Sequence, residues 1–441
     1  MRSRGVGVAT SVGAALSLAA ISCGGTADIE EQLAAVPGVL EVSEVDSEIP
    51  GYRYFFIAFD QPADHAHPER QRFTQRLTLH HRDVASPLTL VTAGYQLWLP
   101  AQVLTEPAAL VGGSQLVVEH RYFDVSRPEP VDWTLLDIEQ AAADHEAIAR
   151  SFREVYTGKW ISTGKSKGGA AAIFHRRFHP GTVDGTVAYV APLTLGQDDP
   201  RYVDFLDRVG TAECRKRLQD FQREVLIRRD AMIPRMADQA ADSGLSYEVM
   251  GIIPTFEGAV RTFSFSFWQS RDEASCASIP GAAASDDEVW SFFDGVKGTL
   301  LSTDPHVLGM EPYRWQARTE LGTPGIDTKG IDDLLTVDVD ALDDLPTIDL
   351  DPVFDPAPAE DIASWFPSGG DHILLIHGEN DPWTAAALEP GSAPESYKLV
   401  VPRGDHSSTI AALPEPDRQL ALDALEAWTG VPPDSPVTPP P

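Results

Sequence analysis

A short stretch before the middle of the chain, residues 160–180, most constrains the fold. Its sequence is WISTGKSKGGAAAIFHRRFHP, an apolar β-branched run followed by a serine between glycines and then by small residues. Residues 164–168, GKSKG, fit G-x-S-x-G, the sharp strand-to-helix turn that lifts a serine hydroxyl above a sheet. The pattern also occurs by chance, so the alternative is an ordinary serine in a Gly-rich turn. The rest of the sequence has to decide between the two.

Strand-like and helix-like segments alternate around this turn. Residues 87–95 and 115–123 have the β-branched, apolar character of buried strands, whereas 133–156 favours a helix. Earlier in the chain, residues 52–63 and 72–81 alternate apolar and polar side chains, which predicts two antiparallel strands. Strands separated by helices indicate parallel βαβ units. We therefore expect an α/β fold with a doubly wound, mostly parallel sheet.

The sequence pattern changes after the first half of this domain. Helical spacing, an aromatic run and an acidic, proline-containing stretch replace the strand pattern, and a strand signal returns only with DHILLIHG at residue 371. This interruption predicts a helical cap inserted into the α/β domain. The expected division of the chain is a signal peptide (1–22), a tether (23–45), the first part of the α/β domain (46–196), the cap (197–365), the second part (366–430) and a Pro-rich tail (431–441).

Charge excludes several classes of partner. The chain has 66 acidic and 34 basic residues, a net charge of −32, which argues against nucleic acid and anionic membrane surfaces. Cationic groups such as peptide N-termini would be attracted, although a solvated acidic surface is the simpler interpretation. No CxxC pair or His-rich cluster occurs, so we expect no metal site.

The N-terminus is typical of an exported protein. Two arginines precede an apolar stretch that is too short to span a bilayer. Cys23 follows LAAIS, which resembles a lipoprotein cleavage site and predicts a lipid anchor on that cysteine, with plain secretion as the alternative. Cys214 and Cys276 then remain, and an even count in an oxidising compartment favours a disulfide between them.

A catalytic serine needs a base and an orienting carboxylate, and after a G-x-S-x-G turn the chain order is Ser, Asp or Glu, then His. Asp381 follows the strand-like segment in LLIHGENDPW, and His406 follows the next one in LVVPRGDHSS. We therefore predict Ser166 as nucleophile, Asp381 as orienting carboxylate and His406 as base. Asp405 is a rival for Asp381, although adjacent side chains rarely face each other.

The developing oxyanion would need two backbone donors. The amide of Lys167 follows the nucleophile directly, and the loop TAGYQ after an early strand offers the backbone of Gly94, Tyr95 or Gln96. An ordinary turn is the alternative for that loop. No acid–base role is expected for the side chains of Lys165 and Lys167.

Several motifs resemble one known group. Residues 117–145, VVEHRYFDVSRPEPVDWTLLDIEQAAADH, resemble a stretch of the bacterial secreted prolyl tri- and tetrapeptidyl aminopeptidases and, more distantly, prolylcarboxypeptidase and dipeptidyl peptidase II. GKSKGG and GENDPW are similar to the serine and acid turns of the bacterial group. Asp124 stands where that group commonly has glycine. The resemblance implies an α/β-hydrolase with a helical cap, serine peptidase chemistry without a cofactor, and release of short peptides from unblocked N-termini after proline.

A pocket for proline would be apolar and aromatic. Candidates are Trp383 and the cap run Phe263, Phe265, Phe267 and Trp268, although such a run more often packs in a core. Glu119 could hold the substrate ammonium, pair with Arg121 or hold a loop. The many acidic residues of the cap leave the choice of the ammonium site open. The alternative functions are an esterase or lipase with the same three residues and, less favoured, an inactive surface-binding protein. The sequence leaves the oligomeric state open.

Overall fold

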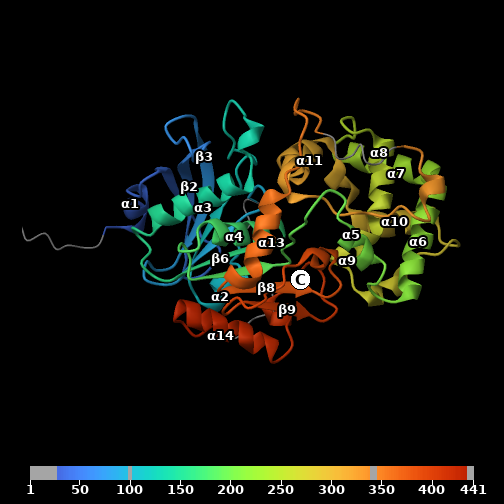
Figure 1. Cartoon of the computed structure of the whole chain (residues 1–441). Coiled ribbons are helices and arrows are strands. Elements are labelled where there is room, and N and C mark those ends of the chain that lie inside the picture. Colours follow the sequence, from blue (N-terminus) through green and yellow to red (C-terminus); the bar gives the residue numbers. More distant parts are fainter. Residues whose placement is uncertain (1–26, 98–101, 338–344, 435–441) are drawn as a thin grey trace, which may run out of the picture.

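The computed structural model describes residues 27–97, 102–337 and 345–434, and these form a layered α/β body with a helical region beside it (Figure 1). The predicted signal peptide and Cys23 lie outside the described residues. Within the described part, one nine-stranded sheet has the order β1-β2-β3-β5-β4-β6-β7-β8-β9. The strands are β1 (Val39–Val45), β2 (Arg53–Pro62), β3 (Arg72–His81), β4 (Leu88–Thr92), β5 (Ser114–Val118), β6 (Trp160–Lys165), β7 (Gly185–Tyr189), β8 (Ile373–Gly378) and β9 (Tyr397–Val401).

The sheet is antiparallel at one end and parallel over the rest. β1, β2, β3 and β5 pair antiparallel in turn, and the pairs from β5 through β4, β6, β7 and β8 to β9 are parallel. β2 and β3 form the antiparallel pair expected from their alternating sequence, and β4 to β9 form the expected parallel sheet. Parallel strands all end at one edge, which gathers the loops that follow them.

The prediction of a tether over residues 23–45 is wrong for its described part. Helix α1 (Ile29–Ala34) buries Leu33 in a core that includes side chains of β2 and β3, and β1 pairs with β2. β1 is an edge strand whose side chains are half-buried or exposed, with Leu40 59% exposed. Such a strand has no continuous apolar run, so its sequence resembles an acidic linker.

Helices cover both faces of the sheet. On one face α3 (Ile138–Phe152), α4 (Lys167–Phe178) and α13 (Ala357–Gly369) pack together, and on the other α14 (Asp417–Thr429) packs with the end of α2 (Glu106–Leu110). α13 buries Ala359, Ile362 and Phe366 against sheet residues. The cap boundary predicted at residue 365 therefore falls inside a helix of the α/β domain. The proline-rich tail continues beyond residue 434, outside the described part.

The remaining helices form the cap between β7 and α13. Figure 1 shows α6, α7, α8 and α10 gathered at one end of the molecule, away from the strands. The cap has its own apolar core, which includes the side chains of Phe221, Phe256 and Phe293. Its helices are α5 (Pro200–Leu206), α6 (Ala212–Ile227), α7 (Arg229–Asp242), α8 (Ile252–Arg261), α9 (Phe263–Ser270), α10 (Asp286–Lys297), α11 (Asp304–Gly309) and α12 (Glu311–Gln316).

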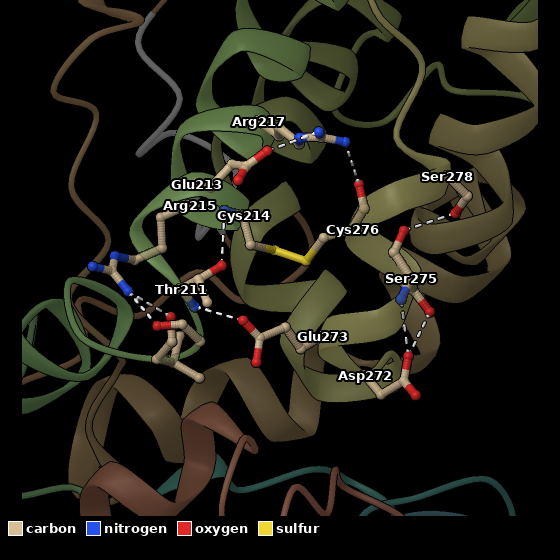
Figure 2. Close-up of a disulfide and its surroundings, with 12 residues drawn as sticks. Thr211, Glu213, Cys214, Arg215, Arg217, Asp272, Glu273, Ser275, Cys276 and Ser278 are labelled. Carbon is tan, nitrogen blue, oxygen red and sulfur yellow. Dashed lines mark hydrogen bonds and ion pairs between the residues drawn. A yellow bond between two sulfur atoms is a disulfide. The ribbon is translucent and has the colours of Figure 1, made fainter.

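A disulfide joins two cap segments. Cys214 on α6 is bonded to Cys276 on a 3-10 turn (Glu273–Ser278), with their Cα atoms 5.5 Å apart (Figure 2). Thr211 accepts a hydrogen bond from the Cys214 amide at 3.2 Å, which caps α6 beside the bridge. Both sulfur-bearing side chains lie in the cap core. The disulfide therefore fixes α6 against the turn that follows α9.

No helix in the described ranges has the length and apolar character needed to cross a membrane. Within the same ranges, no cluster of three or more histidine, cysteine, aspartate or glutamate side chains is arranged to hold a metal ion.

Replacing both cysteines by alanine should destabilise the cap. The disulfide closes a loop across a sequence separation of 62 residues, and a crosslink of this kind contributes about 2–4 kcal/mol. Thermal unfolding of the Cys214→Ala/Cys276→Ala variant should begin at a lower temperature than that of the wild type. Reductant should lower the wild-type midpoint and leave the variant unchanged. Equal midpoints for wild type and variant would contradict a stabilising bridge.

Candidate active site

The serine turn joins β6 to α4 with a strained backbone. Ser166 has φ 57° and ψ −127°, a conformation that few residues other than glycine adopt, and its amide donates to the Tyr189 carbonyl at 2.8 Å. The flanking glycines are sterically required. A Cβ on Gly164 would lie 2.3 Å from the carbonyl carbon and oxygen of Gly168, and one on Gly168 would lie 2.5 Å from the Thr92 oxygen. The chain therefore forms the sharp turn that the sequence pattern predicts.

The loop after β4 packs directly on this turn. A Cβ on Gly94 would lie 2.7 Å from the Gly168 nitrogen, so only glycine allows the approach. Lys167 begins α4, and its amide has no acceptor within the helix. The amides of Gly94 and Tyr95 also donate to no acceptor among the described residues. Free N–H groups of the two segments thus adjoin Ser166, where an oxyanion would form.

The side chain of Lys167 holds that loop in place. Its Nζ donates to the Gly94 carbonyl at 2.7 Å and lies 5.4 and 5.3 Å from the ring centroids of Tyr95 and Phe123. Burial lowers the pKa of Lys167 well below its ordinary value. Because C=O and N–H point in opposite directions across a trans peptide, fixing the Gly94 carbonyl also fixes the Tyr95 N–H. No local sequence pattern indicates this role, since the loop lies more than 70 residues before the lysine.

Asp381 and His406 form a buried pair. Asp381 follows β8, and its Oδ2 lies 2.8 Å from His406 Nδ1. Its Oδ1 accepts from the Trp383 amide at 3.2 Å. Burial raises the pKa of Asp381, and the bond to His406 acts in the opposite direction. Asp405, the rival carboxylate, instead accepts a hydrogen bond from the Ser407 amide at 2.8 Å.

The His406 loop is also tied to the cap. The His406 amide donates to the carbonyl of Gln269, at the end of α9, at 3.1 Å. The Trp383 ring lies 6.3 Å from the His406 ring and belongs to the same cavity wall as Ser166. No hydrogen bond joins the Ser166 hydroxyl to the imidazole among the described contacts.

A cavity of about 550 Å³, its open mouth included, lies over Ser166. Its wall is mostly apolar and aromatic, with polar atoms from a few residues. It is lined by Tyr95, Ile138, Ser166, Lys167, Ala170, Phe174, Pro192, Leu193, Thr194, Tyr313, Glu320, Leu321, Gly322, Ala359 and Trp383. The α/β domain and the segment after α12 therefore build the site together.

The predicted aromatic residues divide into two groups. Trp383 lines the cavity, as expected. Phe267 and Trp268 do not, because α9 turns both side chains into the cap core. Instead, Phe265 of the same helix packs against Trp383, with ring centroids 5.2 Å apart. The prediction that Phe267 and Trp268 bind substrate is therefore wrong, and the core interpretation holds for them.

Glu119 is the second correction. It is fully buried, forms an ion pair with Arg76, and accepts hydrogen bonds from Ser126 Oγ at 2.6 Å and from the Leu97 amide at 2.8 Å. It is absent from the cavity wall. Glu119 thus holds the loop after β4 rather than a substrate ammonium. Arg76 also bonds Asp124 at 2.6 Å, a residue with φ 44°, a backbone conformation that favours glycine.

Comparisons with known proteins agree with this geometry. A mostly parallel sheet with a strained serine turn after a central strand and an Asp–His pair after the last two strands defines an α/β-hydrolase with serine-based chemistry. A family model described as PS-10 peptidase S37 matches residues 24–440. The prolyl tri/tetrapeptidyl aminopeptidase of Streptomyces mobaraensis is 35% identical over 434 residues, which cover 97% of this chain and 90% of the relative. The chain belongs to the peptidase S37 family and is a serine peptidase, so the resemblance seen in the sequence is confirmed.

Solved structures give more distant matches. The proline iminopeptidase of Mycobacterium smegmatis is 11% identical, with 88% of this chain and 99% of that chain covered and a TM-score of 0.36. Rv0554 of Mycobacterium tuberculosis is 13% identical, with 79% and 91% covered and a TM-score of 0.38.

Replacing Lys167 by methionine tests its positioning role. Methionine keeps an unbranched apolar chain but leaves the Gly94 carbonyl without its donor, so the Tyr95 N–H loses its fixed direction. We expect kcat to fall roughly 10- to 1,000-fold, the upper end being the loss of one oxyanion donor, with KM nearly unchanged. Steady-state kinetics check this. Lys165→Met, a change at an exposed neighbour, is the control, and equal kcat values for the two variants would contradict the role.

Proposed function

We propose that this peptidase is an exopeptidase that releases tri- or tetrapeptides from unblocked N-termini, with proline preferred before the cleaved bond. The carrying observation is the strained Ser166 turn, which opens on the same apolar cavity as Trp383 next to the Asp381–His406 pair. The 35% identity to a prolyl tri/tetrapeptidyl aminopeptidase supports the substrate class.

The proposed chemistry uses three side chains. Ser166 Oγ attacks the carbonyl carbon of the proline residue while His406 Nε2 takes the hydroxyl proton. Asp381 holds His406 Nδ1–H and stabilises the imidazolium that forms. His406 then protonates the leaving amine, the peptide bond breaks, and an acyl-enzyme remains on Ser166. Water, deprotonated by His406, hydrolyses this ester and frees the short peptide.

The oxyanion of each tetrahedral intermediate is assigned to the amides of Lys167 and Tyr95. The Lys167 amide follows Ser166 directly, Tyr95 lines the same cavity as Ser166, and neither amide donates to an acceptor among the described residues. In this mechanism, the hydrogen bond between Ser166 and His406 forms when substrate binds, because such bonds often tighten only in the substrate complex.

The cavity supports a preference for proline. Its aromatic and aliphatic wall suits a ring without a backbone N–H. The ring of Trp383 is held by Phe265 and by Tyr202, whose centroid lies 5.6 Å away. A rigid aromatic wall of this kind favours one compact side chain.

We also propose export and a lipid anchor on Cys23. Both rest on the N-terminal sequence, and the disulfide between Cys214 and Cys276 is compatible with an oxidising compartment. Mass spectrometry of the protein made in a bacterial host with lipoprotein processing tests this: a diacylglyceryl group on Cys23 is the expected result, and an unmodified Cys23 would contradict it.

Three substrates test the proposed activity. The protein should cleave Ala-Ala-Pro-p-nitroanilide and leave its N-acetylated form almost untouched. Turnover of p-nitrophenyl butyrate without turnover of either peptide would replace the exopeptidase assignment by an esterase.

Two variants test the catalytic residues on the same peptide. Ser166→Ala should abolish turnover, and His406→Ala should lower kcat on the order of 10⁴-fold or more, because the members of such a triad act as a unit. Circular dichroism checks that both variants remain folded. A folded Ser166→Ala protein with retained turnover would contradict the assignment of the nucleophile.

A further inference from the structure

Among the described residues, Glu320 supplies the only carboxylate on the wall of the catalytic cavity. It lies on a π-helical turn (Ala317–Leu321) that follows α12. π-Helical turns are rare and occur mostly at functional sites. Sequence reasoning missed this residue, because nothing in the acidic composition of the insertion distinguishes one glutamate from the others.

Glu320 is not engaged in an ion pair with any described residue, although the charge of Lys167 acts on it. Its Oε2 accepts a hydrogen bond from the Ile138 amide at 2.9 Å, at the start of α3, and no ion pair to it occurs among the described residues. Every other wall residue is neutral except Lys167, whose Nζ is bonded to the Gly94 carbonyl. Partial burial of a carboxylate without a counter-ion costs free energy, because the charge loses water. Binding of a cation offsets that free energy.

The surroundings make this end of the cavity attractive to a cation. Asp137 and Glu139, at the start of α3, and Asp355, before α13, all act on Glu320, and Lys167 on α4 is the opposing charge. Burial, followed by the carboxylates of Asp137, Asp355 and Glu139, raises the pKa of Glu320 to about 8. A bound ammonium would reverse that shift.

We propose that Glu320 binds the α-ammonium of the peptide substrate and so makes the enzyme depend on an unblocked N-terminus. This inference rests on the proposed function and adds the residue that recognises the amine. The ammonium donates to the Glu320 carboxylate while the scissile carbonyl lies at Ser166. The separation of these two residues therefore determines the length of the peptide that is released.

The alternative is a structural role, in which Glu320 only caps α3 through the Ile138 amide. Glutamine separates the two roles. Its side-chain oxygen still accepts from the Ile138 amide, but it carries no charge for an ammonium. Glu320→Gln therefore keeps the cap and removes the proposed site.

The experiment combines this variant with removal of the amine. Ala-Ala-Pro-p-nitroanilide is compared with propionyl-Ala-Pro-p-nitroanilide, which has the same size but a hydrogen in place of the first amino group. For the wild type, loss of the amine should lower kcat/KM roughly 10- to 100-fold, as expected for a hydrogen bond between charged groups. Glu320→Gln should lose about the same factor on the amine substrate and nothing further on the propionyl substrate.

The outcomes distinguish this inference from the proposed function. If the wild type prefers the amine substrate and Glu320→Gln prefers it equally, Glu320 is not the recognition site, whereas the exopeptidase assignment stands. If the variant loses the same factor on both peptides, its role is structural. If the wild type treats both peptides alike, or cleaves only p-nitrophenyl butyrate, the proposed function fails and this inference fails with it.

Thermal stability gives a readout that does not depend on activity. A carboxyl group whose pKa is raised from 4.5 to about 8 in the folded protein destabilises it as the pH rises through that interval. Glu320→Gln should therefore unfold at the wild-type temperature near pH 5 and at a higher temperature at pH 9. A lower unfolding temperature at both pH values would indicate that the charge of Glu320 stabilises the fold, and would overturn the proposal.

Discussion

The contact between three backbone segments at Ser166 is the constraint on which the site depends. The end of β6, the first turn of α4 and the loop after β4 approach so closely that Gly164, Gly168 and Gly94 leave no room for a Cβ. This packing holds Ser166 in its strained conformation, next to backbone amides that donate to no acceptor among the described residues. The Lys167 side chain holds the loop after β4 in place by donating a hydrogen bond to the Gly94 carbonyl. The conformation of Ser166 is thus determined by the packing of the backbone itself.

The cap contributes to the site through a few defined contacts. The end of α9 bonds the amide of His406, and Phe265 of the same helix supports Trp383. The segment after α12 supplies Glu320 to the cavity wall. In the proposed mechanism, the α/β domain carries the reacting groups, and the insertion shapes the space in which a substrate would lie. In our account, substrate length and the need for a free amine depend on the insertion.

The parallel part of the sheet and the Asp381–His406 pair could be predicted because both follow local rules: buried strands are continuous apolar runs, and the acid and base follow consecutive strands. Other features depended on tertiary contacts that no local pattern encodes. β1 is an exposed edge strand whose sequence resembles a tether. Only the tertiary contacts of Glu119 with Arg76 and Leu97 distinguish among its three possible roles. Glu320 carries no local signal, since its environment comes from α3, α4 and residues near 355.

Covalent labelling tests the central claim, that the strained turn presents Ser166 as the nucleophile. The protein would be treated with a fluorophosphonate and digested, and the modified residue located by mass spectrometry. The account predicts one adduct per chain, on Ser166, and slower labelling when Ala-Ala-Pro is present as a competing product. An adduct on a different serine, or an unlabelled Ser166 in protein whose peptidase activity has been lost to the reagent, would contradict it.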